Sequence, residues 1–167
     1  MKDQMVPNTG QASKTDIALY QSIVGSLLYL ATHTREDIAW VCGMLSKFLT
    51  NPSEIHMKAA RRVFQYLSGT IYLAVLFGGD GCNGKVDDDV IYLLHAYSDS
   101  DWGGDFHTYL STTGYVFFFA GGVISCRSKR QTAVALSSTE AEYYALTHTA
   151  MEASWLRQVF AELEWIH

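Results

Sequence analysis

Two short acidic segments carry the residues whose types and spacing could do chemistry. The first, YSDSDWGG at residues 97–104, follows an apolar run, and the second, LSSTEAEY at residues 136–143, opens a helical pattern. Hard divalent cations prefer carboxylate oxygens, so an aspartate at a strand end and a glutamate in a first helical turn are suitable ligands. Asp99 and Glu142 are therefore the candidate catalytic and metal-binding residues, for metal-dependent hydrolysis of a phosphodiester.

Both segments also have a purely structural interpretation. SSTE at residues 137–140 and TEAE at residues 139–142 each match a capping box, and acidic residues stabilise the first turn of a helix. SDSD at residues 98–101, followed by WGG, is equally typical of a turn. Asp101 shares strand parity with Asp99 if the extended geometry continues, which makes it a second carboxylate candidate.

The elements that would position these residues form a β-rich second half. The pattern predicts strands over residues 90–97, 114–120 and 123–126, the last resuming at 132–136, with Gly121-Gly122 as a tight hairpin turn. A long helix follows, and steps of four and three predict its core-facing stripe as Glu142, Leu146, Thr149, Ala153, Leu156, Phe160 and Leu163. A carboxylate on that side is costly unless it is paired or metal-bound. The first strand would have an open edge, which a parallel fourth strand would continue.

The first half is expected to be helical. Residues 1–15 are interpreted as a flexible lead-in, followed by helices over residues 16–31 and 36–50. NPSE at residues 51–54 predicts the start of a third helix, with Glu54 completing a capping box, and Gly69 is placed for a left-handed end. Residues 71–77 read as a strand and residues 80–89 as a loop. The chain is thus divided into a helical region, 16–80, and a mixed region, 90–167.

Composition limits the function classes. The chain has 167 residues, is 49% hydrophobic and carries a net charge of −5, so it is globular and gives no global reason to expect nucleic-acid binding. His56, Lys58, Arg61 and Arg62 form one basic helix face that could track a duplex. The three scattered cysteines indicate buried free thiols rather than a disulfide framework or zinc site. No export signal or membrane span is expected, which predicts an intracellular protein, cytoplasmic or nuclear.

In combination, the motifs resemble the ribonuclease H domain of copia-type retrotransposon polyproteins. The segments that carry this resemblance are YSDSDWGG (97–104), STTGY (111–115), SKRQ (128–131) and LSSTEAEY (136–143). Upstream, GSLLYL (25–30), TREDIA (34–39) and HMKAARR (56–62) resemble the segment that joins reverse transcriptase to that domain. The similarity covers nearly the whole chain after about Thr15.

This resemblance implies an α/β (α+β) ribonuclease H-like mixed sheet that cuts the RNA strand of RNA–DNA hybrids with two Mg²⁺ ions. It implies that Asp99 is the first catalytic aspartate and, by the E-Y-x-A pattern of residues 142–145, that Glu142 is the helix glutamate. Glu140 then becomes a helix-start residue, and Asp101 a motif residue without an assured ligand role. The expected nucleic-acid contacts are Lys129, Arg130, Gln131, Ser138, Arg61 and Arg62, and the expected partners are the hybrid and the remainder of the polyprotein.

Two departures from the family pattern stand out. Glu36 occupies a position where the family usually has proline. The family's remaining two carboxylates fall beyond His167, so the sheet is expected to be incomplete, with three antiparallel strands and the first helix, and this chain alone is expected to have little nuclease activity. Two alternatives stay open: a non-catalytic module that binds nucleic acid or protein, and an enzyme completed by a strand from a partner.

Overall fold

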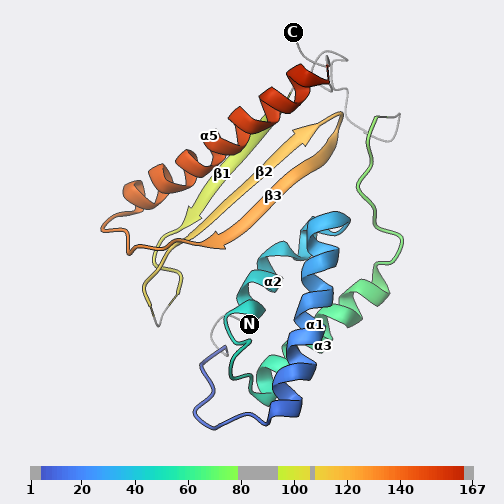
Figure 1. The fold of residues 1–167 in the computed structure, drawn as a ribbon, viewed down its shortest axis with the longest axis vertical. Coiled ribbons are helices and arrows are strands. Elements are labelled where there is room, and N and C mark those ends of the chain that lie inside the picture. The colour runs from blue at the N-terminus through green and yellow to red at the C-terminus, as the bar shows by residue number, and fades with distance from the viewer. Residues whose placement is uncertain (1–4, 79–93, 106–107, 164–167) are drawn as a thin grey trace. The chain divides into compact units, whose positions relative to one another are not determined.

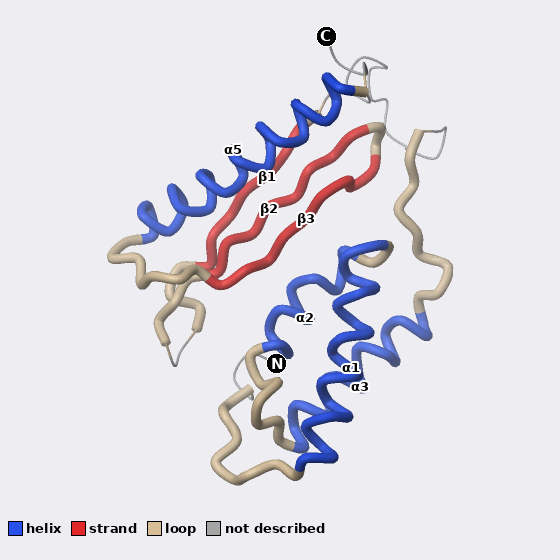
Figure 2. Tube along the Cα trace, viewed as in Figure 1, coloured by secondary structure: helices blue, strands red, loops and turns tan. Residues whose placement is uncertain are grey.

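The computed structural model describes residues 5–78, 94–105 and 108–163. The chain divides into two compact units, Met1–Val75 and Leu76–His167, which are described separately. The described residues form a mixed α+β structure, with four α-helices and one three-stranded antiparallel sheet (Figures 1 and 2). Within this part of the chain, no helix has the length and apolar content needed to span a membrane.

The first unit is a helical cluster. It contains α1 (Lys14–His33), the short 3₁₀ helix η2 (Glu36–Ile38), α2 (Ala39–Ser46) and α3 (Glu54–Gly69). The helix α1 begins at Ser13, whose hydroxyl accepts the backbone N–H of Asp16. The residues that bury its core are Tyr20, Val24, Leu27 and Ala31 of α1, Ile38, Cys42 and Leu45 of η2 and α2, and Met57, Ala60 and Val63 of α3.

Residues 5–13 have no regular secondary structure but contact this cluster. Met5 is buried in the core. The Asn51 side chain donates to the carbonyls of Asn8 and Gly10 and accepts the N–H of Ala12, at 2.9–3.2 Å. These bonds satisfy the side chain of Asn51, the residue placed at the start of the third helix by its sequence.

Helix α3 starts and ends differently from the prediction. Ser53 is its N-cap, and the capping box is completed by His56, whose Nδ1 accepts the N–H of Ser53 at 2.9 Å. Glu54 instead forms an exposed i,i+4 ion pair with Lys58. Gly69 remains helical rather than left-handed, and the helix ends as Thr70 N–H donates to Leu67.

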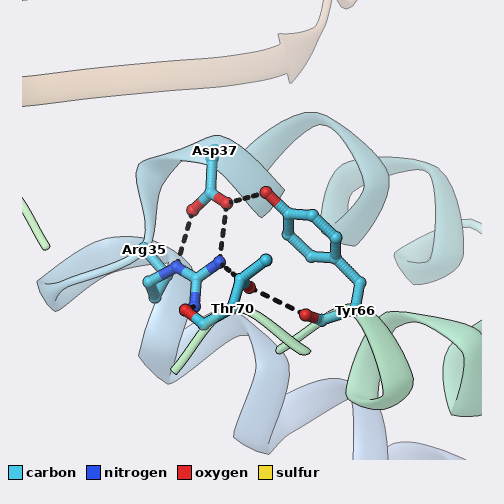
Figure 3. A network of polar contacts seen from close by, with 4 residues as sticks. All are labelled: Arg35, Asp37, Tyr66 and Thr70. Atoms are coloured by element: carbon cyan, nitrogen blue, oxygen red, sulfur yellow. Dashed lines mark hydrogen bonds and ion pairs between the residues drawn. The ribbon is translucent and has the colours of Figure 1, made fainter. Parts of the chain in front are cut away.

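A network around Arg35 joins the end of α3 to the start of η2 (Figure 3). The guanidinium donates to both carboxylate oxygens of Asp37, at 3.0 and 2.8 Å, and to the carbonyl and hydroxyl of Thr70. The Tyr66 hydroxyl donates to the same carboxylate at 2.7 Å. The bonds from Arg35 hold the pKa of Asp37 below its ordinary value. TREDIA therefore has a structural role, because its Arg and Asp fasten two helices together.

The predicted second helix is shorter than expected, since α2 ends at Ser46, and the predicted strand over residues 71–77 is wrong. This stretch is not paired with another strand, and Ile71, Tyr72 and Leu73 are exposed. Its β-branched and aromatic composition resembles that of a strand, but a strand requires a pairing neighbour.

The predicted loop at 80–89, with Cys82, and the beginning of the predicted strand at 90 lie outside the described residues. Cys42 is buried, which raises the pKa of its thiol to about 11, and Cys126 is half-buried; neither forms a disulfide bond with another described residue.

The second unit is a meander covered by one helix. Its strands are β1 (His95–Asp101), β2 (Thr112–Phe119) and β3 (Gly122–Arg130), in the order β1-β2-β3, and the helix is α5 (Ser138–Glu162). Phe119 pairs with Gly122, so Ala120 and Gly121 alone make the turn, with φ of +51° and +79°. Two consecutive positive φ values are the signature of a type I′ hairpin, one residue earlier than predicted. β3 is continuous to Arg130, and residues 132–136 do not resume it.

Helix α5 lies along the face of the sheet, mainly over β1 and β2 (Figure 1). Its buried residues are Ala141, Ala145, Thr149, Leu156 and Phe160. The predicted stripe is therefore correct from Thr149 to Phe160, rotated by one residue in the first turns, where Glu142 and Leu146 are exposed, and wrong at Leu163, which is exposed. Alanines at these positions allow the helix backbone to approach the sheet, which places their larger neighbours outside.

Candidate active site

Asp99 lies in the C-terminal half of strand β1. The strand continues to Asp101, so Asp99 lies within it, opposite Gly114 of β2, and its side chain is exposed. Ala96 packs with Tyr115 and Phe117 beneath α5, whereas His95 and Tyr97 contact Phe118 on the other face. Because side chains alternate along a strand, Asp99 belongs to the face opposite α5.

Helix α5 brings Glu142 to the same strand. Glu142 Oε1 accepts the backbone N–H of Ser100 at 3.4 Å, one residue from Asp99. In the described sheet β1 is an outer strand, so alternate N–H groups of β1 point away from β2. Glu142 thus contacts this edge of β1 from the helix-covered face, one residue along the strand from Asp99, whose side chain belongs to the opposite face.

Glu140 has a different role from Glu142. Its backbone N–H donates to the N-cap hydroxyl of Ser137 at 3.1 Å, and its carboxylate accepts the N–H of Leu136 at 2.7 Å. The Ser137 hydroxyl thus caps the helix as in a capping box, but the Glu140 carboxylate binds the N–H of Leu136 and not that of the N-cap Ser137. Glu140 therefore lies in the first turn of α5, as expected of a helix-start residue, whereas Glu142 follows that turn, contrary to the sequence prediction, and contacts β1.

Asp101 belongs to a turn. Its carboxylate lies against Gly104, where a β-carbon would overlap it, and Gly103 adopts a positive φ of 60°. The neighbouring Trp102 donates its indole N–H to the carbonyl of Ala135 at 3.0 Å. The interpretation of YSDSDWGG as a turn is therefore correct for residues 101–104.

The oxygen donors of Asp99 and Glu142 are of the type that a hard cation binds, but two carboxylates are fewer than a metal site needs. Glu142 contacts the backbone of β1 at Ser100, Asp99 is the next residue of that strand, and the hydroxyl of Ser100 is buried without a hydrogen-bond partner. Over residues 5–78, 94–105 and 108–163, no three or more Asp, Glu, His or Cys side chains cluster as a metal site would need. Asp99 and Glu142 could supply two of the oxygens that Mg²⁺ prefers.

The predicted nucleic-acid contacts fall in different places. Lys129 and Arg130 are exposed at the end of β3, although Arg130 forms an ion pair with Asp105 at 3.2 Å. Ser138, the first residue of α5, is exposed. Arg61 and Arg62 are exposed on α3 of the first unit, whereas His56, from the same predicted basic face, is fully buried.

Gln131 is 4% exposed and holds the scaffold together. Its side-chain amide donates to the Thr113 hydroxyl of β2 at 3.1 Å and to the carbonyl of Ala141 in α5 at 3.0 Å. Both N–H donors are therefore used inside the unit. They fix the first turn of α5, which ends at Ala141 beside Glu142, relative to the sheet.

Three residues that the sequence analysis passed over line a pocket beside Lys129. They are Arg127 of β3 and Tyr144 and His148 of α5, the last two with their rings 5.1 Å apart. Their spacing in the sequence could have indicated this pocket. Arg127 and Lys129 are two residues apart and share one face of a strand, and Tyr144 and His148 are four residues apart and share one face of a helix.

The chain has relatives among transposon polyproteins. It is 44% identical over 144 residues to the retrovirus-related Pol polyprotein from transposon TNT 1-94 of Nicotiana tabacum, a match that covers 86% of this chain and 10% of that protein. It is 41% identical over 149 residues to the Pol polyprotein from transposon RE1 of Arabidopsis thaliana, covering 89% and 10%. The chain thus spans about a tenth of the length of these polyproteins.

A third relative is comparable in length to the chain. Secreted RxLR effector protein 161 of Plasmopara viticola is 43% identical over 137 residues, which cover 82% of this chain and 90% of that protein. No family model matches the chain, and no solved structure matches it. Identities of about 40% across more than four-fifths of its length nevertheless show that the chain is homologous to a segment of about 150 residues in copia-type retrotransposon Pol polyproteins.

Proposed function

We propose that the second unit is a ribonuclease H-like domain of the polyprotein, which acts on the RNA strand of RNA–DNA hybrids through Asp99 and Glu142. The observation that carries the proposal is the contact between the Glu142 carboxylate and the backbone of Ser100, next to Asp99. A glutamate near the start of the helix that reaches the strand carrying the aspartate is the arrangement that the family motifs imply.

The roles of the residues follow from their positions. Asp99 and Glu142 would hold Mg²⁺, which when bound supplies charge stabilisation and an activated water for phosphodiester hydrolysis. Ser100 orients Glu142 through its N–H, and Gln131 fixes the helix that carries Glu142. Two-metal hydrolysis uses more carboxylates than these two, so we propose that further ligands come from another segment of the polyprotein or from a partner chain.

The first unit is proposed to be the tail of reverse transcriptase and its connection to the nuclease. Arg61 and Arg62 extend from α3 into solvent, whereas Lys58 on the same helix is paired with Glu54. Exposed arginines of this kind form salt-sensitive contacts with the phosphates of a duplex. The partners in this proposal are an RNA–DNA hybrid and the remainder of the polyprotein.

Cleavage of a labelled RNA–DNA hybrid in the presence of Mg²⁺ tests the proposal. The chain would be assayed alone and after fusion to the polyprotein segment that follows it in an intact relative, with Asp99→Asn and Glu142→Gln in each form. We expect cleavage in the fused form and its loss in both variants. Glu162→Gln, which removes an exposed carboxylate at the far end of the same helix, is the matched control.

The outcomes separate the alternatives. Cleavage that survives both substitutions would contradict the roles given to Asp99 and Glu142. Cleavage by the chain alone that disappears in both variants would show that this segment needs no additional ligands. A fused protein that binds the hybrid without cutting it would reject the nuclease.

A second candidate is a non-catalytic binding module. It is favoured by the effector protein, 90% of which is covered by this segment, because a segment of this kind there makes up nearly a whole protein. A further observation is the apolar outer surface of α5, where Tyr143, Leu146, Met151 and Trp155 are more than half exposed. Salt-sensitive hybrid binding that is unchanged by Asp99→Asn would support a nucleic-acid module.

A further inference from the structure

The two outer strands of the described sheet differ in how their edges are protected against pairing. β3 ends in three cations, Arg127, Lys129 and Arg130, and like charges repel a second copy of the same strand. β1 reads HAYSDSD and carries a histidine as well as acidic residues. No other described strand pairs with its outer edge. Within the described residues, β1 is therefore the edge at which the sheet can extend.

The backbone groups of Ala96 and Ser98 point out of this edge. The N–H of Ser100 donates to the carboxylate of Glu142, which contacts β1 at its outer edge. Along a strand, the N–H and C=O groups of every second residue point to the same side, so Ala96 and Ser98 share the outward direction of Ser100. These two residues offer their donors and acceptors to a neighbouring antiparallel strand.

One antiparallel register brings unlike side chains of two β1 strands together. When Tyr97 lies opposite Tyr97 of a second copy, His95 of each copy lies opposite Asp99 of the other. In the same register Ala96 faces Ser98, so their outward backbone groups pair. Side chains directly opposite each other have β-carbons about 4.5–5.5 Å apart. β1 is thus complementary to itself, as a symmetric interface requires.

The side chains that meet in this register share the face of the sheet opposite α5. The His95 ring stacks on Phe118 with 5.2 Å between centroids, and Tyr97 meets the same ring edge-on at 6.1 Å. A neutral imidazole carries one N–H, so His95 can donate to the Asp99 carboxylate of the other copy. Tyr97 is 66% exposed, and pairing of two Tyr97 rings would bury apolar surface.

Helix α5 presents an apolar row above the same edge. Leu146 and Ala150 follow Glu142 at intervals of four residues, so they share the side of the helix that reaches β1. Both are exposed. Because α5 lies over β1 and β2, pairing of two β1 strands would place the two helices about two strand spacings, or roughly 10 Å, apart. Helices pack at about this distance, so the two rows would cover each other.

We propose that the second unit forms a symmetric dimer, in which the β1 strands of two copies pair and join their sheets into one. The interface consists of the ladder between Ala96 and Ser98, the pairs of His95 with Asp99, the contact between the Tyr97 rings and the row that contains Leu146. The occupant of the edge is a second copy because the complementarity is that of β1 with itself. This proposal is independent of the proposed nuclease, since it needs neither metal nor nucleic acid.

Sedimentation equilibrium of the whole chain over a concentration series tests the proposal. We expect a dimer. His95→Asp places carboxylates opposite each other at both symmetric positions and is expected to weaken dimerisation roughly tenfold or more. Asp99→Lys removes the same pairs and is expected to have a similar effect. Lys129→Glu changes the charge of the other outer strand and should dimerise like the wild type.

Mixing the two variants gives a sharper test of the register. In a heterodimer of His95→Asp with Asp99→Lys, one pair of positions holds Asp and Lys and the other holds Asp99 and His95. Opposite partners are thus restored at both positions. We expect the mixture to form a heterodimer with an affinity close to that of the wild type. Association of two variants that are separately monomeric cannot result from misfolding.

Two further measurements address the helix row and the backbone ladder. Leu146→Glu is expected to weaken dimerisation several-fold. Met151→Glu is its control, because Met151 is exposed and lies two and a half turns from Glu142, on the opposite side of α5. Hydrogen exchange of the Ala96 and Ser98 amides should slow as the concentration of the wild type rises, but not in His95→Asp.

Four results would overturn the proposal. The first is a wild-type chain that stays monomeric at the highest concentration, and the second is failure of the mixed variants to associate. The third is a dimer that Lys129→Glu disrupts, which would assign the interface to β3. The fourth is protection of the Ala96 and Ser98 amides only after fusion to the polyprotein segment that follows in an intact relative, which would assign the edge to that segment.

Discussion

Glu142, just after the first turn of α5, accepts the backbone N–H of Ser100 at 3.4 Å. Glu140, two residues earlier, turns back to the N–H of Leu136 instead. Two similar residues in one helical turn thus have separate roles, one directed at the strand and one at the end of its own helix.

Substituting the two glutamates separately should separate stability from metal binding. Glu140→Ala removes a capping interaction and is expected to lower the free energy of unfolding by about 1 kcal/mol. Glu142→Ala breaks one long, exposed hydrogen bond and should change stability by less than about 0.5 kcal/mol. Thermal unfolding gives the first quantity, and Mn²⁺ titration should show weaker binding in Glu142→Ala only. Equal effects of both substitutions on Mn²⁺ affinity would contradict this division.

Gln131 should matter for the stability of the second unit. Gln131→Ala leaves the buried carbonyl of Ala141 and the hydroxyl of Thr113 without their donor, which is expected to cost about 1–3 kcal/mol. Hydrogen exchange of the first-turn amides of α5 measures the effect. Gln158→Ala, an exposed glutamine on the same helix, is the control and should leave that exchange unchanged.

Arg35→Lys is expected to destabilise the first unit although it keeps the charge. Lysine cannot reproduce the paired bonds to Asp37 together with those to Thr70, so the expected loss is about 1–3 kcal/mol. Hydrogen exchange in α3 reports on this unit alone. The matched substitution Arg61→Lys, on an exposed face of α3, should stay within about 0.5 kcal/mol. A similar small effect for Arg35→Lys would show that the network contributes little.

The first unit should lose stability as the solution becomes mildly acidic. Burial lowers the pKa of His56, so in the folded state the ring takes up a proton only at a pH below its ordinary value near 6.5. Below about pH 6.5 the unfolded chain binds more protons, and stability falls with pH until the folded pKa is passed. Protonation at Nδ1 would also remove the acceptor for the Ser53 N–H.

His56→Gln should flatten this dependence, because glutamine keeps a capping acceptor and does not titrate in this range. The measurement is hydrogen exchange in α3 as a function of pH, corrected for the intrinsic exchange rate. His33→Gln removes an exposed histidine and is expected to leave the dependence unchanged. A profile that is identical in wild type and His56→Gln would assign the effect to other groups.

Elements with a clear period could be predicted from the sequence, and those decided by tertiary partners could not. Helices α1 and α5 and strand β2 were predicted within a few residues, because their apolar residues recur regularly. The stretch at 71–77 has the composition of a strand, but its lack of a pairing neighbour cannot be read locally. Gly69 ended a helix without the left-handed conformation expected of it, because Thr70 completed the turn.

The candidate site was predicted in its motif residues but not in its geometry. Asp99 and Glu142 follow from the family resemblance, and the assignment of Glu140 to the cap is confirmed. The exposure of Glu142 was missed, because Ala141 and Ala145 pack closer to the sheet than larger side chains could. Gln131 reads as an exposed neighbour of Lys129 and Arg130, and only the three-dimensional arrangement reveals that it bonds to two other elements.

The two-residue turn at Ala120-Gly121 has a kinetic consequence. Closing a short loop loses less chain entropy than closing a long one, and hairpins of this kind form in about 1–10 μs. The β2-β3 pair is therefore expected to nucleate the sheet, whereas β1 must wait for the longer connection over residues 102–111. Asp99 lies on that later strand, and Glu142 reaches its place only after α5 has docked onto it. The two carboxylates should thus come together at the end of the folding of this unit, and a folding intermediate would lack them as a pair.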